Sequence, residues 1–343
     1  MNLTRRGKPT IIDIATLAGV SYSTVSRVAT NANHVNPATR ERVLAAMKQL
    51  GYVANQHARS LLTGRSKIIG LLVHGLGSMY IEEIFRGVEE ELATLEYDAL
   101  LYTTHRRQGR EAEYVSAITR GFAEGLLLVA PLAREHYLET LQSANFPHVL
   151  VDEAIPDERS PSVGIPNRTS MYRATRHLLE LNHRRIAFIT DIMKLNTAIE
   201  RLKGYQDALA DYGLPYDASL VREDNYDRPK PETATGTLLS LPNPPTAILT
   251  SSDPIAFRVM AVLLHRYKLT VPDDVSVMGF DDSPGASFVY PRLTTVRHPI
   301  YEMGKEAARM LLERIENPHV PPEHVELETE LVVRDSCRAL ERT

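Results

Sequence analysis

Two groups of side chains in this sequence could bind a partner through hydrogen bonds, one near the N-terminus and one spread along the rest of the chain. In the first group, Tyr22, Ser23, Ser26 and Arg27 occupy positions that share the outer face of a helix. Hydroxyl groups and a guanidinium fork suit the edges of nucleic-acid bases, and one arginine can donate to both O6 and N7 of a guanine. Tyr22 could alternatively pack inside the protein.

The second group consists of polar residues that directly follow short apolar runs. Asp152 follows residues 149–151, Ser252 lies just after 247–250, and Asp281 follows 275–280. If these runs are strands of a parallel sheet, their C-terminal ends meet at the edge where ligands bind. A carboxylate accepts hydrogen bonds from vicinal hydroxyls and an arginine donates a fork, so this set suits a polyol.

Catalytic and cofactor motifs are missing from the sequence. Residues 74–80 contain two glycines after an apolar run but lack the third glycine of a dinucleotide-binding fingerprint, and no Walker, HExxH or G-x-S-x-G pattern occurs. The single cysteine, Cys337, excludes an internal disulfide framework and a multi-cysteine metal cluster. We therefore expect no enzymatic activity, no cofactor and no metal site.

Charge is distributed unevenly along the 343 residues. Residues 1–67 hold ten Lys or Arg and two acidic side chains, whereas the remainder holds 29 basic and 41 acidic ones. The chain is thus a basic segment of net charge +8 joined to an acidic body of −12. A basic segment attracts a polyanion such as DNA, and the acidic body repels it. A solvated basic tail is the alternative interpretation.

The basic segment has the pattern of three short helices, over residues 11–18, 22–29 and 37–50. The first two are joined by the three-residue turn 19–21, which predicts a helix-turn-helix arrangement, with a generic small bundle as the alternative. Capping residues mark each helix end: Thr10, Ser21 and Asn36 at N-termini, and Gly19 and Gly51 at C-termini. Val43, Leu44, Met47 and Leu50 are predicted to form the inner stripe of the third helix.

The acidic body alternates short apolar runs with longer amphipathic stretches, which indicates an α/β fold with doubly wound parallel sheets. This alternation of apolar runs and amphipathic stretches begins again near residue 162, so two similar lobes enclosing one cleft are expected. Strands are predicted over 68–74, 98–103, 125–130, 148–152, 185–190, 246–251 and 275–280. Helices are predicted near 79–95, 111–123, 134–144, 170–181, 198–212, 231–240, 254–267 and 300–316. The longest uncharged apolar stretch, residues 125–133, is too short to cross a bilayer.

The segment from Thr10 to Val28 resembles the DNA-binding head of the lac repressor/galactose repressor family, and the resemblance covers essentially the whole chain. It implies a helix-turn-helix domain over 1–52, a hinge helix and linker over 53–67, and a two-lobed core over 68–343 similar to periplasmic binding proteins. The implied N-lobe comprises residues 68–162 and 297–324, and the implied C-lobe comprises residues 163–296 and 325–343.

The resemblance also implies which residues contact DNA. Arg27 matches an arginine that contacts a base, and Leu61 matches a hinge-helix leucine that wedges into a minor-groove base step. Ala54 departs from the family's usual proline at the hinge entry, His34 could simply be solvated, and Leu62 could be an ordinary core residue. The implied DNA contacts are Thr10, Ser21, Tyr22, Ser23, Thr24, Ser26, Arg27, Thr30, His34, Asn36, Asn55, Ala58 and Leu61.

For the effector, the resemblance implies contacts from both lobes, with surface or core placement as the alternative for several of them. Asp253 is expected to cap the helix that follows it. The pair Pro166-Asn167 replaces a common Asp-Asn pair, and residues 105–107 (His-Arg-Arg) could favour an anionic sugar if they are not solvated. The sequence has no tryptophan to stack on a sugar ring. The implied effector residues are Met79, Tyr80, Asp152, Ile165, Arg201, Ser252, Asp281 and His298.

Together these observations predict a transcriptional regulator, expected to be a repressor, whose affinity for double-stranded operator DNA is controlled by a small, sugar-like effector. Two-fold protein symmetry matches a near-palindromic operator, so we expect a homodimer. Residues 337–343 carry no leucine heptad, which favours a dimer over a tetramer. No export signal or membrane segment is recognised, which predicts a cytoplasmic protein. A corepressor that is a nucleobase or sugar phosphate, and a pure solute-binding protein, are the alternatives.

Overall fold

The structure is a computed structural model that describes residues 9–29, 35–51, 65–76, 79–104, 110–132, 134–153, 157–224 and 231–341. The chain divides into two compact units, residues 1–67 and residues 68–343, here called the head and the core. None of the helices within the described ranges combines the length and the apolar character that a bilayer span needs.

The head consists of α1 (Ile11–Ala18), α2 (Tyr22–Ala29) and α3 (Pro37–Leu50), which confirms the three predicted helices. Thr10 and Asp13 form a capping box, in which the Thr10 backbone N–H donates to the Asp13 carboxylate at 2.8 Å. Gly19 and Gly51 both adopt φ +63°, the left-handed conformation that ends a helix. These caps explain where α1 begins and where α1 and α3 end.

The head is stabilised by a small apolar core. Ile14 of α1, Val25 of α2 and Val43 of α3 are fully buried and meet in one cluster. The predicted inner position of Leu44 is wrong, because this side chain is 51% exposed while Ala46 is buried. Residues that share a helix face recur three and four positions apart, and from Val43 this rule selects Ala46 rather than its immediate neighbour.

The N-lobe of the core is a six-stranded parallel sheet with the order β11-β5-β4-β3-β1-β2. Helices cover both faces: α5 and α12 pack on one apolar cluster, and the second cluster includes residues of α6 and α7. The strands are β1 (Ile68–Val73), β2 (Asp98–Thr103), β3 (Gly125–Val129), β4 (His148–Val151), β5 (Ser162–Gly164) and β11 (His324–Glu326). The helices are α5 (Met79–Ala93), α6 (Arg110–Ile118), α7 (Leu138–Ser143) and α12 (Ile300–Glu316).

The C-lobe repeats this plan with a four-stranded parallel sheet of order β7-β6-β8-β9. Helices α8 and α9 contribute to one apolar cluster, and α10 and α11 contribute to the other. The strands are β6 (Ile186–Thr190), β7 (Val221–Glu223), β8 (Ala247–Thr250) and β9 (Ser276–Met278). The helices are α8 (Asn167–Glu180), α9 (Asn196–Asp211), α10 (Pro231–Leu239) and α11 (Asp253–Val262). Short 3-10 turns span Arg134–His136, Ala218–Leu220 and Pro284–Ser287, and a π-turn spans Leu263–Tyr267.

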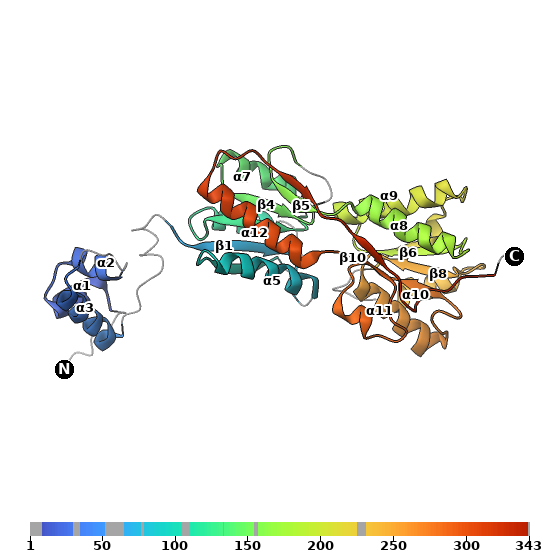
Figure 1. The fold of residues 1–343 in the computed structure, drawn as a ribbon, viewed down its shortest axis with the longest axis horizontal. Coiled ribbons are helices and arrows are strands. Elements are labelled where there is room, and N and C mark those ends of the chain that lie inside the picture. The colour runs from blue at the N-terminus through green and yellow to red at the C-terminus, as the bar shows by residue number, and fades with distance from the viewer. Residues whose placement is uncertain are drawn as a thin grey trace. The chain divides into compact units, whose positions relative to one another are not determined.

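The chain passes between the lobes three times (Figure 1). It leaves the N-lobe sheet after β5, returns before α12, and leaves again after β11. Antiparallel strands β10 (Thr295–Arg297) and β12 (Glu330–Val332) pair with each other along two of these crossings. The three crossings run beside the strand ends, so the two lobes share one hinge region and the polar residues that follow their strands converge on a common cleft.

Candidate functional site

Helix α2 presents polar side chains outward from the head. Tyr22 is 68% exposed, and Ser23 and Arg27 are also exposed, while Val25 and Val28 on the opposite face are buried. At the start of the helix, the Ser21 hydroxyl accepts from the Thr24 backbone N–H at 3.2 Å and lies 2.8 Å from the Ser23 hydroxyl. This arrangement anchors the turn and leaves the N-terminal side chains of α2 on the surface, as insertion into a major groove requires.

The side chains of Thr10 and Asn36, both predicted DNA contacts, cap helices of the head. The Thr10 hydroxyl lies 2.7 Å from the Asp13 carboxylate in the capping box, and the Asn36 side chain accepts from the Ala38 backbone N–H at 3.0 Å. Five further predicted contacts lie outside the described residues: Thr30, His34, Asn55, Ala58 and Leu61.

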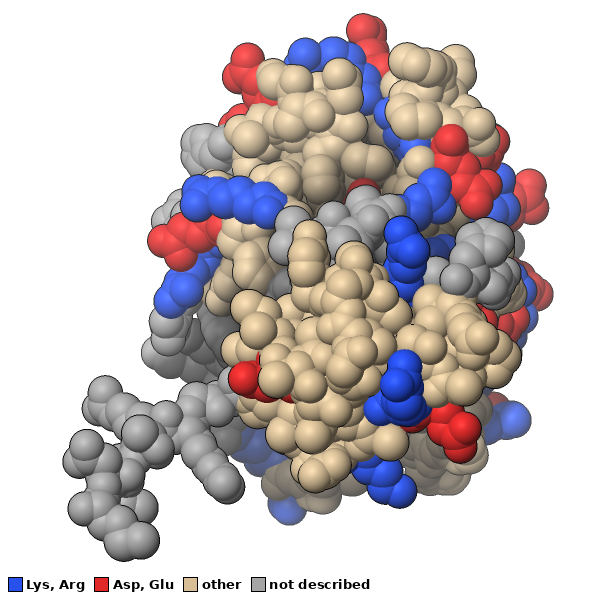
Figure 2. All heavy atoms as spheres, turned by 90° about the vertical axis from the view of Figure 1, so that its left-hand side faces the viewer, with Lys and Arg blue, Asp and Glu red and all other residues tan. Residues whose placement is uncertain are grey.

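Figure 2 shows a face of the molecule on which uncharged side chains predominate in the foreground, with Lys and Arg spaced among them and few acidic residues.

A cavity of about 140 Å³ lies between the lobes of the core and is lined from both of them. Tyr80, Asp152, Arg201, Ser252 and Asp281 line it, so five of the eight predicted effector residues meet at one place; their contact with an effector stays a prediction. Residues of the lining that sequence reasoning did not select include His74, Asp191, Leu195, Thr197 and Ser251. Asp191 directly follows β6, so the strand-end rule that selected Asp152 would also have found it.

Arg201 of α9 is buried and is held in place by two acceptors and an aromatic ring. Its Nε donates to Asn167 Oδ1 at 2.7 Å, and its Nη1 donates to the Ser251 carbonyl oxygen at 2.6 Å. Its guanidinium carbon lies 3.9 Å from the centroid of the Phe280 ring, a cation–π contact. Asn167, of the Pro166-Asn167 pair, therefore orients the arginine.

Asp152 lines the cavity and has one unpaired carboxylate oxygen among the described residues. Its Oδ2 accepts from the Tyr80 hydroxyl at 2.7 Å, whereas its Oδ1 is buried with no hydrogen-bond partner within the described residues. Burial, and then the neighbouring Asp152 charge, raises the pKa of Tyr80 well above its usual value, so the phenol stays a neutral donor. A buried carboxylate oxygen without a donor is costly, so this site is suited to a ligand hydroxyl.

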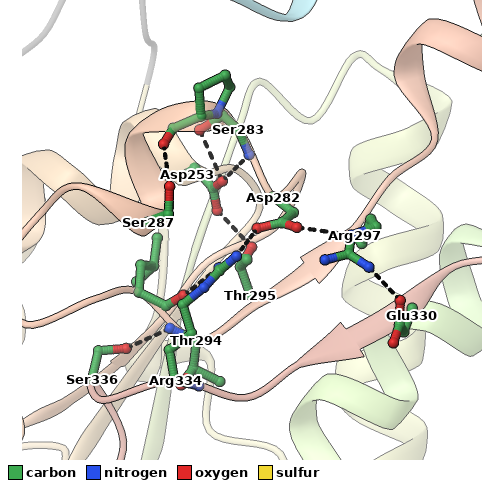
Figure 3. A network of polar contacts seen from close by, with 12 residues as sticks. Asp253, Asp282, Ser283, Ser287, Thr294, Thr295, Arg297, Glu330, Arg334 and Ser336 are labelled. Carbon is green, nitrogen blue, oxygen red and sulfur yellow. Dashed lines mark hydrogen bonds and ion pairs between the residues drawn. The ribbon is translucent and has the colours of Figure 1, made fainter.

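Asp253 was predicted to cap α11, and that prediction is wrong. Its carboxylate is buried and accepts from the Ser283 backbone N–H at 2.7 Å, from the Ser283 hydroxyl at 2.9 Å and from the Thr295 hydroxyl at 2.6 Å (Figure 3). Burial, and then the charge of Asp281, raises the pKa of Asp253 to about 7. Asp253 is the first residue of α11, and its side chain ties that helix to the hinge instead of to its own backbone.

The backbone of Asp281 is held at the cavity edge by the hinge strand β10. Asp281 has φ +118°, its N–H donates to the Val296 carbonyl at 2.8 Å, and its carbonyl accepts from the His298 N–H at 3.2 Å. The next residue, Asp282, forms ion pairs with Arg297 at 2.9 Å and Arg334 at 2.6 Å (Figure 3). Because a positive φ is unfavourable for aspartate, these contacts must hold the conformation.

The remaining three predicted effector residues lie elsewhere. Ile165 lines neither cavity of the cleft: it is buried in the apolar cluster under α8 and α9, where an apolar side chain is most stable. Met79 and His298 line a neighbouring cavity of about 480 Å³, which shares Tyr80 and Asp281 with the first. In the part of the chain that the structure describes, no three His, Cys, Asp or Glu side chains gather as metal ligands do.

Comparison with known proteins matches both units. Residues 10–55 match the model for bacterial regulatory proteins of the lacI family, and residues 175–337 match a periplasmic binding protein-like domain. The HTH-type transcriptional regulator CelR of Thermobifida fusca is 35% identical over 97% of this chain and 99% of its own. The HTH-type transcriptional repressor CytR of Escherichia coli is 32% identical over 96% of this chain and 97% of its own.

Comparison with solved structures also matches transcriptional regulators over nearly the whole chain. A CelR–cellobiose complex has a TM-score of 0.72 and 34% identity and covers 96% of this chain and 99% of its own. A lac repressor dimer bound to operator and the anti-inducer ONPF has a TM-score of 0.80 and 27% identity and covers 97% of this chain and 100% of its own. A helix-turn-helix head followed by a two-lobed ligand-binding core defines a DNA-binding transcriptional regulator. The chain belongs to the lacI family of bacterial regulatory proteins.

Proposed function

We propose that this regulator binds an uncharged, hydroxyl-rich sugar between the lobes of its core, and that the sugar controls its affinity for a specific operator. The observation that carries the proposal is the buried, unpaired Oδ1 of Asp152, which lies beside a cavity that Arg201 and Asp281 also line. A vicinal diol could donate to the two carboxylates and accept from the arginine at once, a pattern typical of sugar recognition.

The charges around the cavity favour an uncharged ligand over an anionic one. Among the described residues, three carboxylates, Asp152, Asp191 and Asp281, line it beside one guanidinium, that of Arg201. Residues 105–107, which could favour an anionic sugar, lie outside the described part of the chain. A sugar phosphate or sugar acid would bring another negative charge into a partly buried site of the same sign, where repulsion is weakly screened. The cellobiose bound to the related CelR is itself an uncharged sugar.

On the DNA side, we propose that Tyr22, Ser23 and Arg27 contact base edges in the major groove, with Ser21, Thr24 and Ser26 beside them. Thr10 and Asn36, whose side chains cap helices, are proposed to contact phosphates through the backbone N–H groups at those helix starts. We also propose that residues 53–67 form the hinge helix and linker, and that Leu61 wedges into a minor-groove base step, as the family resemblance implies.

We further propose that the regulator acts as a cytoplasmic homodimer that represses transcription without catalytic turnover. The related lac repressor binds its operator as a dimer. Phe288 and Tyr290 of the core are 84% and 97% exposed, and aromatic side chains of that size are commonly buried when two subunits associate. Two identical heads would then occupy the two halves of a near-palindromic operator.

Calorimetry of the full chain tests the effector proposal. Neutral sugars, a sugar acid and a sugar phosphate are each titrated with and without operator. We expect binding of a neutral sugar, unaltered sugar after incubation, and a heat that changes when operator is present. Tighter binding of the acid or the phosphate would contradict the charge argument.

A further inference from the structure

The cleft holds two compartments rather than one. The inner compartment is the cavity of about 140 Å³ beside Asp152 and Arg201, and the outer compartment is the cavity of about 480 Å³ beside His298. Tyr80, Pro254 and Asp281 line both, so the two compartments adjoin along these residues. An effector that reaches the inner carboxylates can therefore extend past Tyr80 into the outer compartment.

The inner compartment alone is small for a whole effector. Small-molecule sites usually occupy about 300–1,000 Å³, a range that the inner compartment alone does not reach and that the two compartments together do. Most of the volume of the cleft thus lies in the outer compartment, away from the carboxylates and the arginine that would bind the first sugar unit. Filling the inner compartment only would leave the larger space to water.

The outer compartment has the chemistry of a site for a second uncharged ring. Both arginines that line it already have carboxylate partners: Arg86 pairs with Glu83 at 2.6 Å and lies 4.7 Å from the centroid of the Tyr301 ring, and Arg297 pairs with Asp282 at 2.9 Å. The rings of Tyr80 and Tyr301 supply flat apolar surface. An anionic ligand would have to compete with these carboxylates for the arginines, whereas an uncharged ring would not.

His298 supplies unused hydrogen-bonding capacity at the junction. Its side chain is buried, and neither ring nitrogen has a hydrogen-bond partner in the described part of the chain. The ring centroid lies 6.0 Å from that of Tyr80, and Nδ1 lies 3.5 Å from Asp281 Oδ1. A hydroxyl of a second sugar unit could donate to one ring nitrogen or accept from the other, so this side chain suits a polar ligand.

We infer that the effector is a disaccharide or a longer oligosaccharide, with one sugar unit in the inner compartment, the next in the outer compartment, and the glycosidic bond beside Tyr80. This inference rests on the proposed sugar effector and adds its size. It requires that both compartments contribute to affinity, and that a single sugar unit binds more weakly than two linked ones.

The test is calorimetry on the full chain with matched pairs of sugars: cellobiose and glucose, lactose and galactose, and xylobiose and xylose. The variant Glu302→Trp adds bulk at the rim of the outer compartment, which Glu302 lines. Glu302→Gln, which removes the charge but adds no bulk, is its matched control. Circular dichroism before each titration checks that both variants are folded.

We expect one disaccharide to bind at least tenfold more tightly than either of its units, and Glu302→Trp to remove that advantage while Glu302→Gln retains it. A monosaccharide that binds as tightly as the disaccharide, or a disaccharide advantage that survives Glu302→Trp, would overturn the two-compartment inference and leave the sugar effector standing. If no sugar of either size binds, the proposed function itself fails and this inference falls with it.

Discussion

Arg201→Lys is the substitution that most directly tests how the pocket is built. The arginine occupies two acceptors at once, Asn167 Oδ1 at 2.7 Å and the Ser251 carbonyl at 2.6 Å, while its guanidinium lies over the Phe280 ring. A lysine keeps the positive charge but concentrates its donors on one nitrogen and loses the planar fork. The ammonium group cannot occupy both positions of the fork.

The expected cost follows from the acceptor that loses its donor. Leaving one buried acceptor unsatisfied costs about 1–3 kcal/mol, and the weaker contact with Phe280 adds to this loss. The free energy of unfolding of the core should therefore fall by about 2–4 kcal/mol. Because Arg201 also lines the cavity, sugar affinity should fall at least tenfold, or by about 1.4 kcal/mol.

Urea unfolding followed by circular dichroism, together with calorimetry for the sugar, measures both effects. Arg168→Lys is the matched control: Arg168 also makes a two-bond ion pair, with Asp207 at 2.6 and 3.0 Å, but its side chain is 54% exposed. An exposed pair of this kind contributes about 0–1 kcal/mol. Equal losses in the two variants, or an Arg201→Lys protein with normal stability and sugar affinity, would refute the assignment of Arg201 as a buried, oriented donor.

Three further predictions address base recognition by the head, the pH dependence of stability through Asp253, and the assignment of DNA binding to the head. Arg27→Ala should lose discrimination at one operator base pair, about 1–3 kcal/mol in binding assays with single-base operator variants, and an unchanged base preference in Arg27→Ala would exclude its role. Because the pKa of Asp253 is raised to about 7 from an ordinary 3.8, the native state retains a proton that the unfolded chain releases, so this group's contribution to stability falls as pH rises from about 4 to 7. Asp253→Asn should flatten that dependence in urea unfolding, and the same slope in both proteins would contradict the shift. Removing residues 1–67 should abolish operator binding in a gel-shift assay and preserve sugar binding, and any retained specific DNA affinity would show that the head is not the DNA-binding unit.

The architecture was largely predictable because it depends on patterns that are local in the sequence. All seven predicted strands of the core occur, with ends within two residues of those expected. The strands that were missed, β5, β7, β10, β11 and β12, have three residues each. So few residues show neither a continuous apolar run nor a clear alternation, and they become strands only because a neighbouring strand already offers its backbone.

The candidate site was predictable where a residue acts through its position along a strand. Asp152, Ser252 and Asp281 follow β4, β8 and the β9 segment, and the structure brings all three to one cavity. Ile165 was chosen by position matching alone, and the structure buries it in the C-lobe core. Matching a position to the family pattern identifies where the chain passes near a ligand. The direction of the Ile165 side chain depends instead on the packing of α8 and α9 around it.

The residues that support the pocket from behind could not be inferred from the sequence, because their partners are distant in the chain. Asn167 holds Arg201 across 34 positions, and Thr295 holds Asp253 across 42. A polar group in a partly buried cleft needs such partners, since an unsupported donor or acceptor is costly there. Of the Asp152 carboxylate, one oxygen is bonded to Tyr80 and the other is open. Specificity then depends on which few atoms the supporting residues leave unpaired, so a substitution at Asn167 or Thr295 should alter ligand choice without touching the ligand.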